Sequence, residues 1–321
     1  MAEPRLAPTQ LGRFFDAATD PGGYAWWYAD GLSLDGNYGF TLIAFIGSVF
    51  SPYYAWSRRA DPYNHCAFNL ALYGRSGGRW TMTERGRGDL DVSDNRLGIG
   101  PSAMDWNGET LTIDIAERGM PVPRAVRGQI RLRPRTLNAK AFDIDTPGQH
   151  FWQPIAPSAE VDVRFTEPGL RWTGDAYMDT NRGSRPLEEA FRSWNWSRVH
   201  GADGRTGILY NTVERSGAER NLALVFAPGG GFTTITPPPR AELPPTPVFR
   251  IKRTTRANDP ASVRLGRTLE DTPFYSRSII ESDMLGERCA GIHESFDGDR
   301  LAMPLVKLML PFRMPRRPIR K

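Results

Sequence analysis

The chain of 321 residues is 40% hydrophobic and 24% charged, which excludes a wholly disordered protein and allows one large domain or two ordinary ones. No apolar run approaches the roughly 20 residues that a membrane-spanning helix needs. Two cysteines, Cys66 and Cys289, are too few for a disulfide framework or a cysteine-rich zinc site. Residues 1–20 show no secretory signal, which favours the cytoplasmic side of a membrane.

The net charge of +5 comes from the C-terminus. Residues 304–321 hold six basic residues and no acidic one, which leaves −1 for residues 1–303. A nearly neutral body argues against a nucleic-acid-binding face. Apolar residues between 301 and 312 precede the basic cluster, as in segments that bind a membrane surface. The alternative is a last core strand followed by a disordered basic end.

The sequence predicts mostly β-structure. Asp-Gly, Asn-Gly and Pro-Gly pairs mark turns between short segments in which apolar and polar residues alternate. The clearest strands are expected over 110–115, 129–133, 160–165 and 249–253. This pattern favours a sandwich or barrel over βαβ units.

Other segments interrupt the strands. One short helix is expected over 186–192, where Pro186 stands near the first position and two glutamates fall in the first turn. Six prolines in residues 236–247 predict an exposed polyproline-type loop.

The two halves of the chain differ, because all nine tryptophans lie at or before Trp196. We expect an N-terminal arm, two β domains and a basic tail. Their ranges are 1–20 for the arm, 21–180 and 181–303 for the domains, and 304–321 for the tail.

Large flat side chains cluster at three places. Aromatic residues favour strands, so a core strand explains such a cluster, and so does the wall of an apolar cavity. Both interpretations stay open. The residues expected to line a substrate cavity are Trp27, Tyr28, Tyr53, Tyr54, Trp194 and Trp196.

A sharper group combines a base, two electron-rich rings and a carboxyl group. If each stretch is extended, His150 and Trp152 share one face, and so do Tyr177 and Asp179. A catalytic site and a buried hydrogen-bonded tie both account for this spacing.

Metal chemistry has little support. The acidic stretch from Asp89 to Asn95 lacks the glycine and the closing glutamate of an EF-hand loop, so a solvated turn is expected. The four histidines lack metal-ligand spacing. We expect no metal site.

Three runs of sequence, residues 27–31, 43–54 and 174–198, resemble the carotenoid 1,2-hydratases of photosynthetic bacteria, also called hydroxyneurosporene synthases. The resemblance extends from about residue 22 to the C-terminal tail. It implies an all-β fold of two lipocalin-like β-barrel or sandwich domains, with a cleft between them and few short helices.

The same resemblance implies addition of water to the terminal C1=C2 double bond of an acyclic carotenoid such as lycopene or neurosporene, giving a tertiary alcohol without a cofactor. The family's catalytic His-x-Trp falls on His150 and Trp152, and its Tyr-x-Asp on Tyr177 and Asp179. The implied partners are the carotenoid, water and a membrane surface, with the protein peripheral on the cytoplasmic face.

The chemistry assigns a role to each of the four residues. Protonation of an alkene requires a carboxylic acid kept neutral near pH 7, and Asp179 is the expected acid. Trp152 and Tyr177 are expected to stabilise the carbocation through their ring faces. His150 is expected to orient Asp179 or the attacking water, or to accept its proton.

Other classes of protein stay open. A lipocalin-like carrier would keep the aromatic clusters without needing His150 and Asp179 together. A polyene cyclase of the same architecture would share the rings but exclude water. A glycoside hydrolase needs two facing carboxylates, and only Asp179 is prominent in the sequence.

Overall fold

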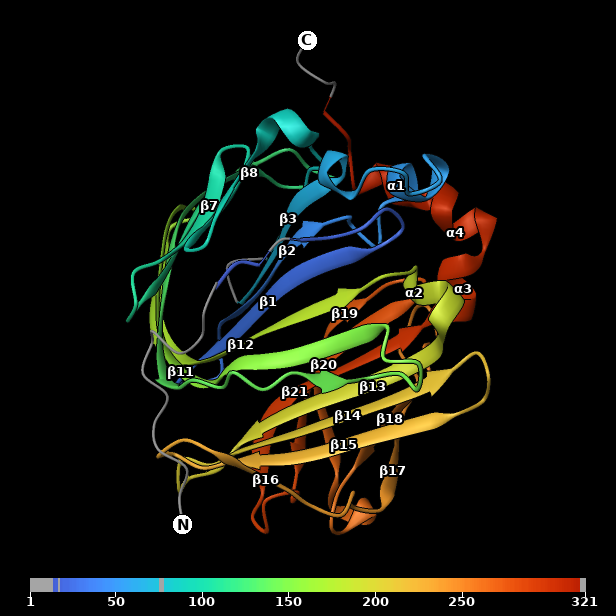
Figure 1. Cartoon of the computed structure of the whole chain (residues 1–321). Coiled ribbons are helices and arrows are strands. Elements are labelled where there is room, and N and C mark those ends of the chain that lie inside the picture. The colour runs from blue at the N-terminus through green and yellow to red at the C-terminus, as the bar shows by residue number, and fades with distance from the viewer. Residues whose placement is uncertain (1–13, 17, 75–77, 318–321) are drawn as a thin grey trace. The chain divides into compact units, whose positions relative to one another are not determined.

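The computed structural model describes residues 14–16, 18–74 and 78–317 and consists mainly of antiparallel strands with a few short helices (Figure 1). The predicted all-β class is confirmed. Two units divide the chain. The larger unit holds the described residues of Leu6–Phe142, Gln149–Pro186 and Lys307–Lys321, and the smaller unit those of Asp143–Gly148 and Leu187–Val306.

The larger unit is built on one twelve-stranded sheet. Its strands are β1 (Tyr24–Ser33), β2 (Gly39–Ile46), β3 (Cys66–Tyr73), β4 (Arg79–Met82), β5 (Leu90–Ser93), β6 (Arg96–Ile99), β7 (Ser102–Trp106), β8 (Leu111–Arg118), β9 (Ala125–Thr136), β10 (Phe142–Asp143), β11 (His150–Glu167) and β12 (Leu170–Gly183). They are ordered β4-β3-β2-β1-β12-β11-β9-β8-β7-β6-β5, and β10 pairs with β11. This order places β12 between β1 and β11, although β1 and β12 are far apart in sequence.

The sheet curls around one apolar core, so that β3 contacts β6 and β4 contacts β8 (Figure 1). Every second residue of β1 from Ala25 to Ala29 enters this core, including Trp27. The residues between them point to the opposite face because side chains alternate along a strand. That opposite face carries Tyr24, Trp26, Tyr28 and Asp30, and all four are buried.

The smaller unit has a seven-stranded sheet and a two-stranded hairpin. The sheet is ordered β16-β15-β14-β13-β21-β20-β19, and the hairpin pairs β17 with β18. The strands are β13 (Phe191–His200), β14 (Thr206–Glu214), β15 (Glu219–Phe226), β16 (Phe232–Thr234), β17 (Arg240–Leu243), β18 (Arg253–Arg256), β19 (Arg264–Asp271), β20 (Tyr275–Ser282) and β21 (Cys289–Asp297). Strand β18 packs on β13 and β21.

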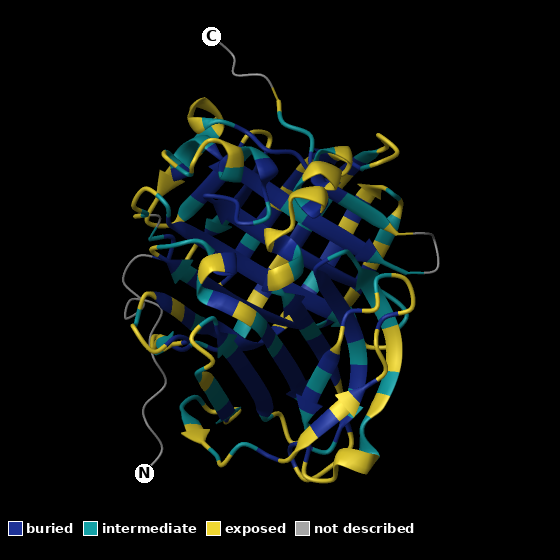
Figure 2. Cartoon of the chain, turned by 90° about the vertical axis from the view of Figure 1, so that its right-hand side faces the viewer, coloured by how far each residue is buried: buried dark blue, intermediate teal, exposed yellow. Residues whose placement is uncertain are grey.

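The helices within the described residues are all short. They are α1 (Pro52–Trp56), α2 (Leu187–Ala190), α3 (Gly298–Ala302), α4 (Pro304–Met309) and the 3-10 turns η2 (Pro62–Asn64), η3 (Arg87–Asp89), η4 (Pro260–Ser262) and η5 (Leu310–Phe312). Within the described ranges, no helix has the length and apolar character to cross a membrane. Figure 2 shows buried residues along much of the strands and many exposed residues on the loops and short helices.

Three of the four predicted strands are confirmed, as parts of β8, β9 and β11. The strand predicted over 249–253 is wrong, because the chain turns there. Arg250 has a φ of 56°, and the amides of Val248 and Phe249 donate to the carboxylate of Asp271. The alternation of apolar and polar residues over 249–253 therefore lies in a loop, and hydrogen bonds to Asp271 hold this loop in place.

The other two local predictions are only partly correct. The helix expected over 186–192 is confined to α2, because β13 already begins at Phe191. The proline-rich segment 236–247 is not a loop throughout, since β17 forms inside it and pairs with β18. Arg240 to Leu243 is the stretch of this segment without proline, so its amides are available for strand pairing.

Candidate active site

Four candidate catalytic residues lie on one face of two neighbouring strands. Tyr177 and Asp179 belong to β12, and His150 and Trp152 begin β11. The β11–β12 register sets Trp152 opposite Asn181 and His150 opposite Gly183. All four candidates are buried. The expected sharing of a face is confirmed.

The carboxyl group of Asp179 is held by two donors. The indole Nε1 of Trp152 donates to Oδ2 of Asp179 at 2.9 Å, and the hydroxyl of Tyr177 donates to the same oxygen at 2.8 Å. Asp179 is only 4% exposed. Because both donors use Oδ2, the proton of a neutral Asp179 belongs on Oδ1.

His150 lies farther along the sheet. Its partner Gly183 is four residues beyond Asp179 on β12, which corresponds to about 13 Å along a strand. The Nδ1 atom of His150 is 2.8 Å from the hydroxyl of Tyr24. Burial, with a smaller contribution from the charge of Arg185, lowers the pKa of His150 to about 4. The imidazole is therefore neutral at pH 7.

Gly183 permits this arrangement. A Cβ atom at this position would lie 2.4 Å from Nδ1 of His150 and 2.5 Å from Cε1 of Tyr24. Only a residue without a side chain lets the Tyr24–His150 pair approach the backbone of β12 so closely.

Sequence reasoning missed a second carboxyl group on the same face. Asp30 lies on β1, is fully buried and accepts a hydrogen bond at Oδ2 from the hydroxyl of Tyr28 at 2.8 Å. Its register partner on β12 is Tyr177. The signal that could have found it is the repetition of Tyr-x-Asp, at Tyr28 to Asp30 and at Tyr177 to Asp179.

The aromatic residues expected to line a cavity have different surroundings in the larger unit. Trp27 belongs to the core inside the curled sheet, where it packs on Phe15. Tyr28 lies on the face of Asp179, and its ring meets that of Tyr177 edge-on with centroids 6.2 Å apart. The structure therefore brings Tyr28, but not Trp27, to the face of the candidate catalytic residues.

Tyr53 and Tyr54 belong to α1. The hydroxyl of Tyr54 donates to the carbonyl of Gly23 at 2.8 Å, and burial raises the pKa of Tyr54 to about 12. Tyr53 is half-buried, and its ring lies edge-on to that of Trp56. The observed contact of Tyr54 is structural, because it ties α1 to the start of β1.

Trp194 and Trp196 belong to β13 of the smaller unit. Both are buried on the same face of the strand. The ring of Trp194 stacks on that of Phe296 with centroids 3.9 Å apart.

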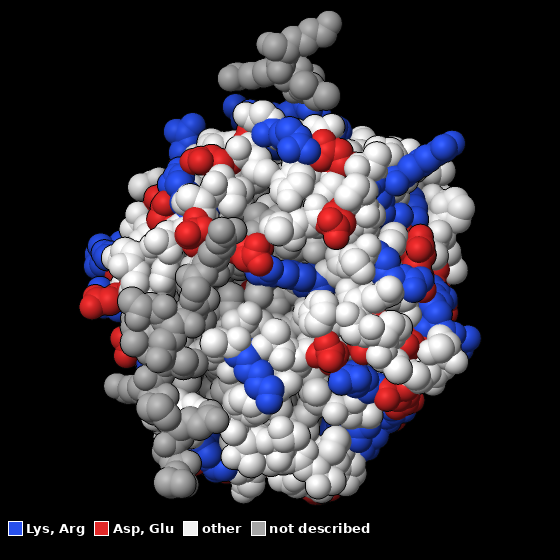
Figure 3. All heavy atoms as spheres, in the orientation of Figure 1, with Lys and Arg blue, Asp and Glu red and all other residues white. Residues whose placement is uncertain are grey.

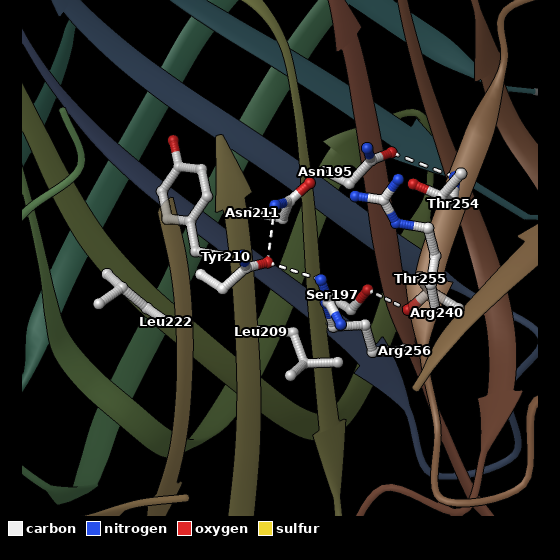
Figure 4. Close-up of a pocket in the computed structure, with 11 residues that line it drawn as sticks. Asn195, Ser197, Leu209, Tyr210, Asn211, Leu222, Arg240, Thr254, Thr255 and Arg256 are labelled. Atoms are coloured by element: carbon white, nitrogen blue, oxygen red, sulfur yellow. Dashed lines mark hydrogen bonds between the residues drawn. The ribbon is translucent and has the colours of Figure 1, made fainter. Parts of the chain in front are cut away.

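The smaller unit also contains pockets that polar and apolar residues line together. One is lined by residues that include Asn195, Ser197, Asn211 and Arg256 (Figure 4), and its volume of about 10 Å³ suits a single water molecule. A second pocket of about 300 Å³ shares Asn195 and Asn211 and adds Lys252.

The described residues include no group of three or more His, Cys, Asp or Glu side chains that could hold a metal ion. In the acidic stretch, Asp91 is exposed and pairs with Arg96 at 2.8 Å. On the face shown in Figure 3, basic and acidic residues are interspersed.

Comparison with known proteins identifies the family. Residues 42–321 match the carotenoid hydratase CrtC family. The acyclic carotenoid 1,2-hydratase of Thiocapsa roseopersicina is 52% identical over 308 residues, covering 95% of this chain and 76% of that protein. The enzyme of the same name from Rubrivivax gelatinosus is 46% identical over 308 residues, covering 94% and 76%.

A solved structure shares the fold. The crystal structure of a proposed AttH from Nitrosomonas europaea has a TM-score of 0.63 and 13% identity, and covers 92% of this chain and 97% of that one. At this identity the likeness concerns the fold alone. The family match and the two close relatives carry the assignment: the chain belongs to the CrtC family of carotenoid hydratases, and the enzyme class expected from the sequence, a hydro-lyase, is confirmed.

Proposed function

We propose that the protein adds water to the terminal C1=C2 double bond of an acyclic carotenoid, with Asp179 as the proton donor. The observation that carries this proposal is the convergence of Trp152 and Tyr177 on one oxygen of a buried carboxyl group. The names of the relatives supply the substrate class, an acyclic carotenoid.

The reaction consists of two bond-forming steps. The proton on Oδ1 of Asp179 moves to C2, the less substituted carbon, and the electron pair of the double bond forms the new C–H bond. The positive charge then resides on C1, a tertiary carbon, where the oxygen of water attaches. Loss of one proton from that oxygen gives the tertiary alcohol, so the net change is one added water.

The surroundings of Asp179 support this role. Burial favours the neutral acid over the carboxylate before the reaction. The two donors on Oδ2 stabilise the negative charge that develops as the proton leaves, because they already point at that oxygen. Trp152 and Tyr177 thus position and strengthen the acid, and their electron-rich rings also favour a neighbouring cation.

The first experiment compares the parent with Asp179→Asn on lycopene or neurosporene in detergent. Mass spectrometry should detect the gain of one water with the parent and at least a thousandfold less product with the variant. Asp175→Asn is the matched control, because Asp175 is a partly exposed carboxyl on the same strand and pairs with Arg135. Turnover of folded Asp179→Asn within tenfold of the parent would remove Asp179 from the acid role.

We also propose that the segment 303–312 docks on an anionic membrane surface, where an apolar substrate resides. Helix α4 and turn η5 are apolar on both sides. Val306 and Leu310 are buried, whereas Leu305, Leu308 and Phe312 are 70%, 60% and 78% exposed. Apolar side chains gathered on an exposed side of a segment indicate an apolar partner there.

Charge favours a lipid partner with anionic headgroups. The sequence from Arg300 to Lys321 contains no acidic residue, and Arg313 and Arg317, which follow the apolar segment in sequence, are exposed. Basic residues near an anionic bilayer contribute about 1 kcal/mol each. Arg316, however, donates to the buried carboxylate of Glu84 and to the carbonyl of Asn64, so its charge is already used within the larger unit.

The test replaces the three exposed apolar side chains together, as Leu305→Ser, Leu308→Ser and Phe312→Ser. This variant should lose sedimentation with anionic liposomes at physiological salt and slow the turnover of liposome-embedded carotenoid, with turnover in detergent unchanged. Leu34→Ser is the control, because Leu34 is 79% exposed in a turn. Full sedimentation of the triple variant, or a change in its oligomeric state instead, would contradict the membrane role.

A further inference from the structure

The motif Tyr-x-Asp occurs on two neighbouring strands of the larger unit. Tyr28 and Asp30 lie on β1, and Tyr177 and Asp179 lie on β12. In each case the tyrosine hydroxyl donates to Oδ2 of the aspartate two residues later, at 2.8 Å. The two local arrangements are therefore the same.

The antiparallel register pairs the tyrosine of each motif with the aspartate of the other. Tyr28 is the partner of Asp179, and Asp30 is the partner of Tyr177. The four side chains therefore share one face, and the two aspartates are diagonal neighbours, roughly 7–8 Å apart between Cα atoms. Asp30 is thus closer to Asp179 than His150 is, since His150 pairs with β12 four residues away.

Both aspartates are buried, Asp30 fully and Asp179 with 4% exposure. Two carboxyl groups at this separation disfavour a double negative charge, so the ionisation of one favours the proton on the other. Pairs of this kind divide the roles of acid and base between two side chains. Asp179 and Asp30 can therefore serve as acid and base, and His150 is not needed for either role.

We propose that Asp30 is the base of the hydration reaction and the partner of Asp179. This inference rests on the function proposed above. Before the reaction, the carboxylate of Asp30 keeps the proton on Asp179. During the reaction, Asp179 gives that proton to C2, water oxygen bonds to C1, and Asp30 takes the proton that the water loses. Return of one proton from Asp30 to Asp179 restores the enzyme, and the net change is one water added.

The primary test is Asp30→Asn, which keeps the size of the side chain but cannot accept the proton. Turnover in detergent should fall at least a hundredfold, with the thermal unfolding midpoint close to that of the parent. Asp30→Ala should regain part of its activity at pH 7 when formate is added, because formate is a small carboxylate base. Asp179→Ala should not respond to formate, because an ionised carboxylate cannot replace an acid.

Further variants separate a base from a structural partner of Tyr28. Tyr28→Phe keeps the carboxylate and removes one donor, so turnover should fall less than in Asp30→Asn. Should the variants without a carboxyl group fail to fold, Asp30→Glu carries the test. It keeps the charge but displaces it, and turnover should fall at least tenfold.

Several results would overturn the role of Asp30. The first two are turnover of Asp30→Asn within threefold of the parent and no response of Asp30→Ala to formate. The others are a loss of turnover in Tyr28→Phe as large as in Asp30→Asn, and parent-like turnover of Asp30→Glu. Each of these leaves hydration by the parent intact. Failure of the parent to hydrate any acyclic carotenoid would instead contradict the proposed function itself, so the two failures are distinguishable.

Discussion

The indole nitrogen of Trp152 donates to Oδ2 of Asp179 across the β11–β12 pair, at 2.9 Å. This contact gives Trp152 a role that a ring face alone would not. The tryptophan fixes the orientation of the carboxyl group, and Tyr177 fixes it from the same strand. The carboxyl group of Asp179 is therefore oriented by two side chains whose own places are set by strand register.

Trp152→Phe should lower turnover by about 10- to 100-fold, because it removes a hydrogen bond to a group that becomes charged, worth about 1.5–3 kcal/mol. Trp152→Ala should lower turnover further and reduce stability by about 3–5 kcal/mol, since it also leaves a cavity. Steady-state kinetics and chemical denaturation measure both effects. The control is Trp172→Phe, the same exchange at a buried tryptophan on the core face of β12. Turnover of Trp152→Phe equal to that of the parent would reduce Trp152 to packing.

Acidification should destabilise the fold through His150. The folded-state pKa of about 4 lies below the unfolded value near 6.5, so the unfolded chain binds the proton first. The free energy of unfolding should fall as the pH drops from about 6.5 to 4, by up to about 3 kcal/mol from this residue. Denaturation at pH 7 and pH 5 measures this loss. His150→Gln should lose less stability over that interval, and identical slopes for parent and variant would contradict burial of a neutral imidazole.

Gly183→Ala should disturb the Tyr24–His150 pair without touching Asp179. The new methyl group would lie within 2.5 Å of both rings, so one of them must move, at a cost of about 1–3 kcal/mol in stability. The imidazole signals of His150 in an NMR spectrum should shift. The control is Gly88→Ala, because a Cβ added at Gly88 meets open space. Gly36→Ala is unsuitable as a control, because Gly36 has a φ of 68°, which alanine rarely adopts. Unchanged His150 signals in Gly183→Ala would show that the close approach is unimportant.

The C-terminal segment should depend on a buried charge. Glu84 is 1% exposed and accepts from Arg316, while its Oε1 lies 2.8 Å from Nδ1 of His65. Arg316→Ala would leave this carboxylate with less compensation and should cost about 3–5 kcal/mol. Arg316→Ala with Glu84→Gln should recover part of that loss. A single variant as stable as the parent in chemical denaturation would show that Arg316 does not anchor the segment.

Alternation along strands allowed much of the fold to be predicted. Strands β9 and β11 contain two of the predicted segments, and β8 contains all but the first residue of a third. The shared face of Tyr177 and Asp179 follows from period two alone. The loop at residues 248–250 was not predictable, because the carboxylate that holds it, Asp271, is 21 residues or more away in sequence. The alternation of apolar and polar residues within a segment carries no information about a contact with a residue so distant in sequence.

The candidate site shows the same limit. The sequence indicated four candidate catalytic residues, but only the β1–β12 register brings Asp30 beside Tyr177. Strand register also decides whether His150 can orient Asp179, as the sequence led us to expect. Each residue lies on the predicted face, yet the register separates them by four residues of β12 and gives His150 the hydroxyl of Tyr24 instead. Pairing between distant strands is a tertiary property that a single strand does not encode.

In the proposed reaction, a protein acid protonates the carotenoid at C2 before water adds at C1. The most direct measurement is turnover of lycopene in D2O by the parent enzyme, with the product washed in ordinary water and analysed by mass spectrometry and NMR. Asp179 exchanges its proton with the solvent, so each hydrated end should carry one carbon-bound deuterium at C2. A hydrated product with no deuterium on carbon would contradict proton transfer from an exchangeable acid, and with it the role of Asp179.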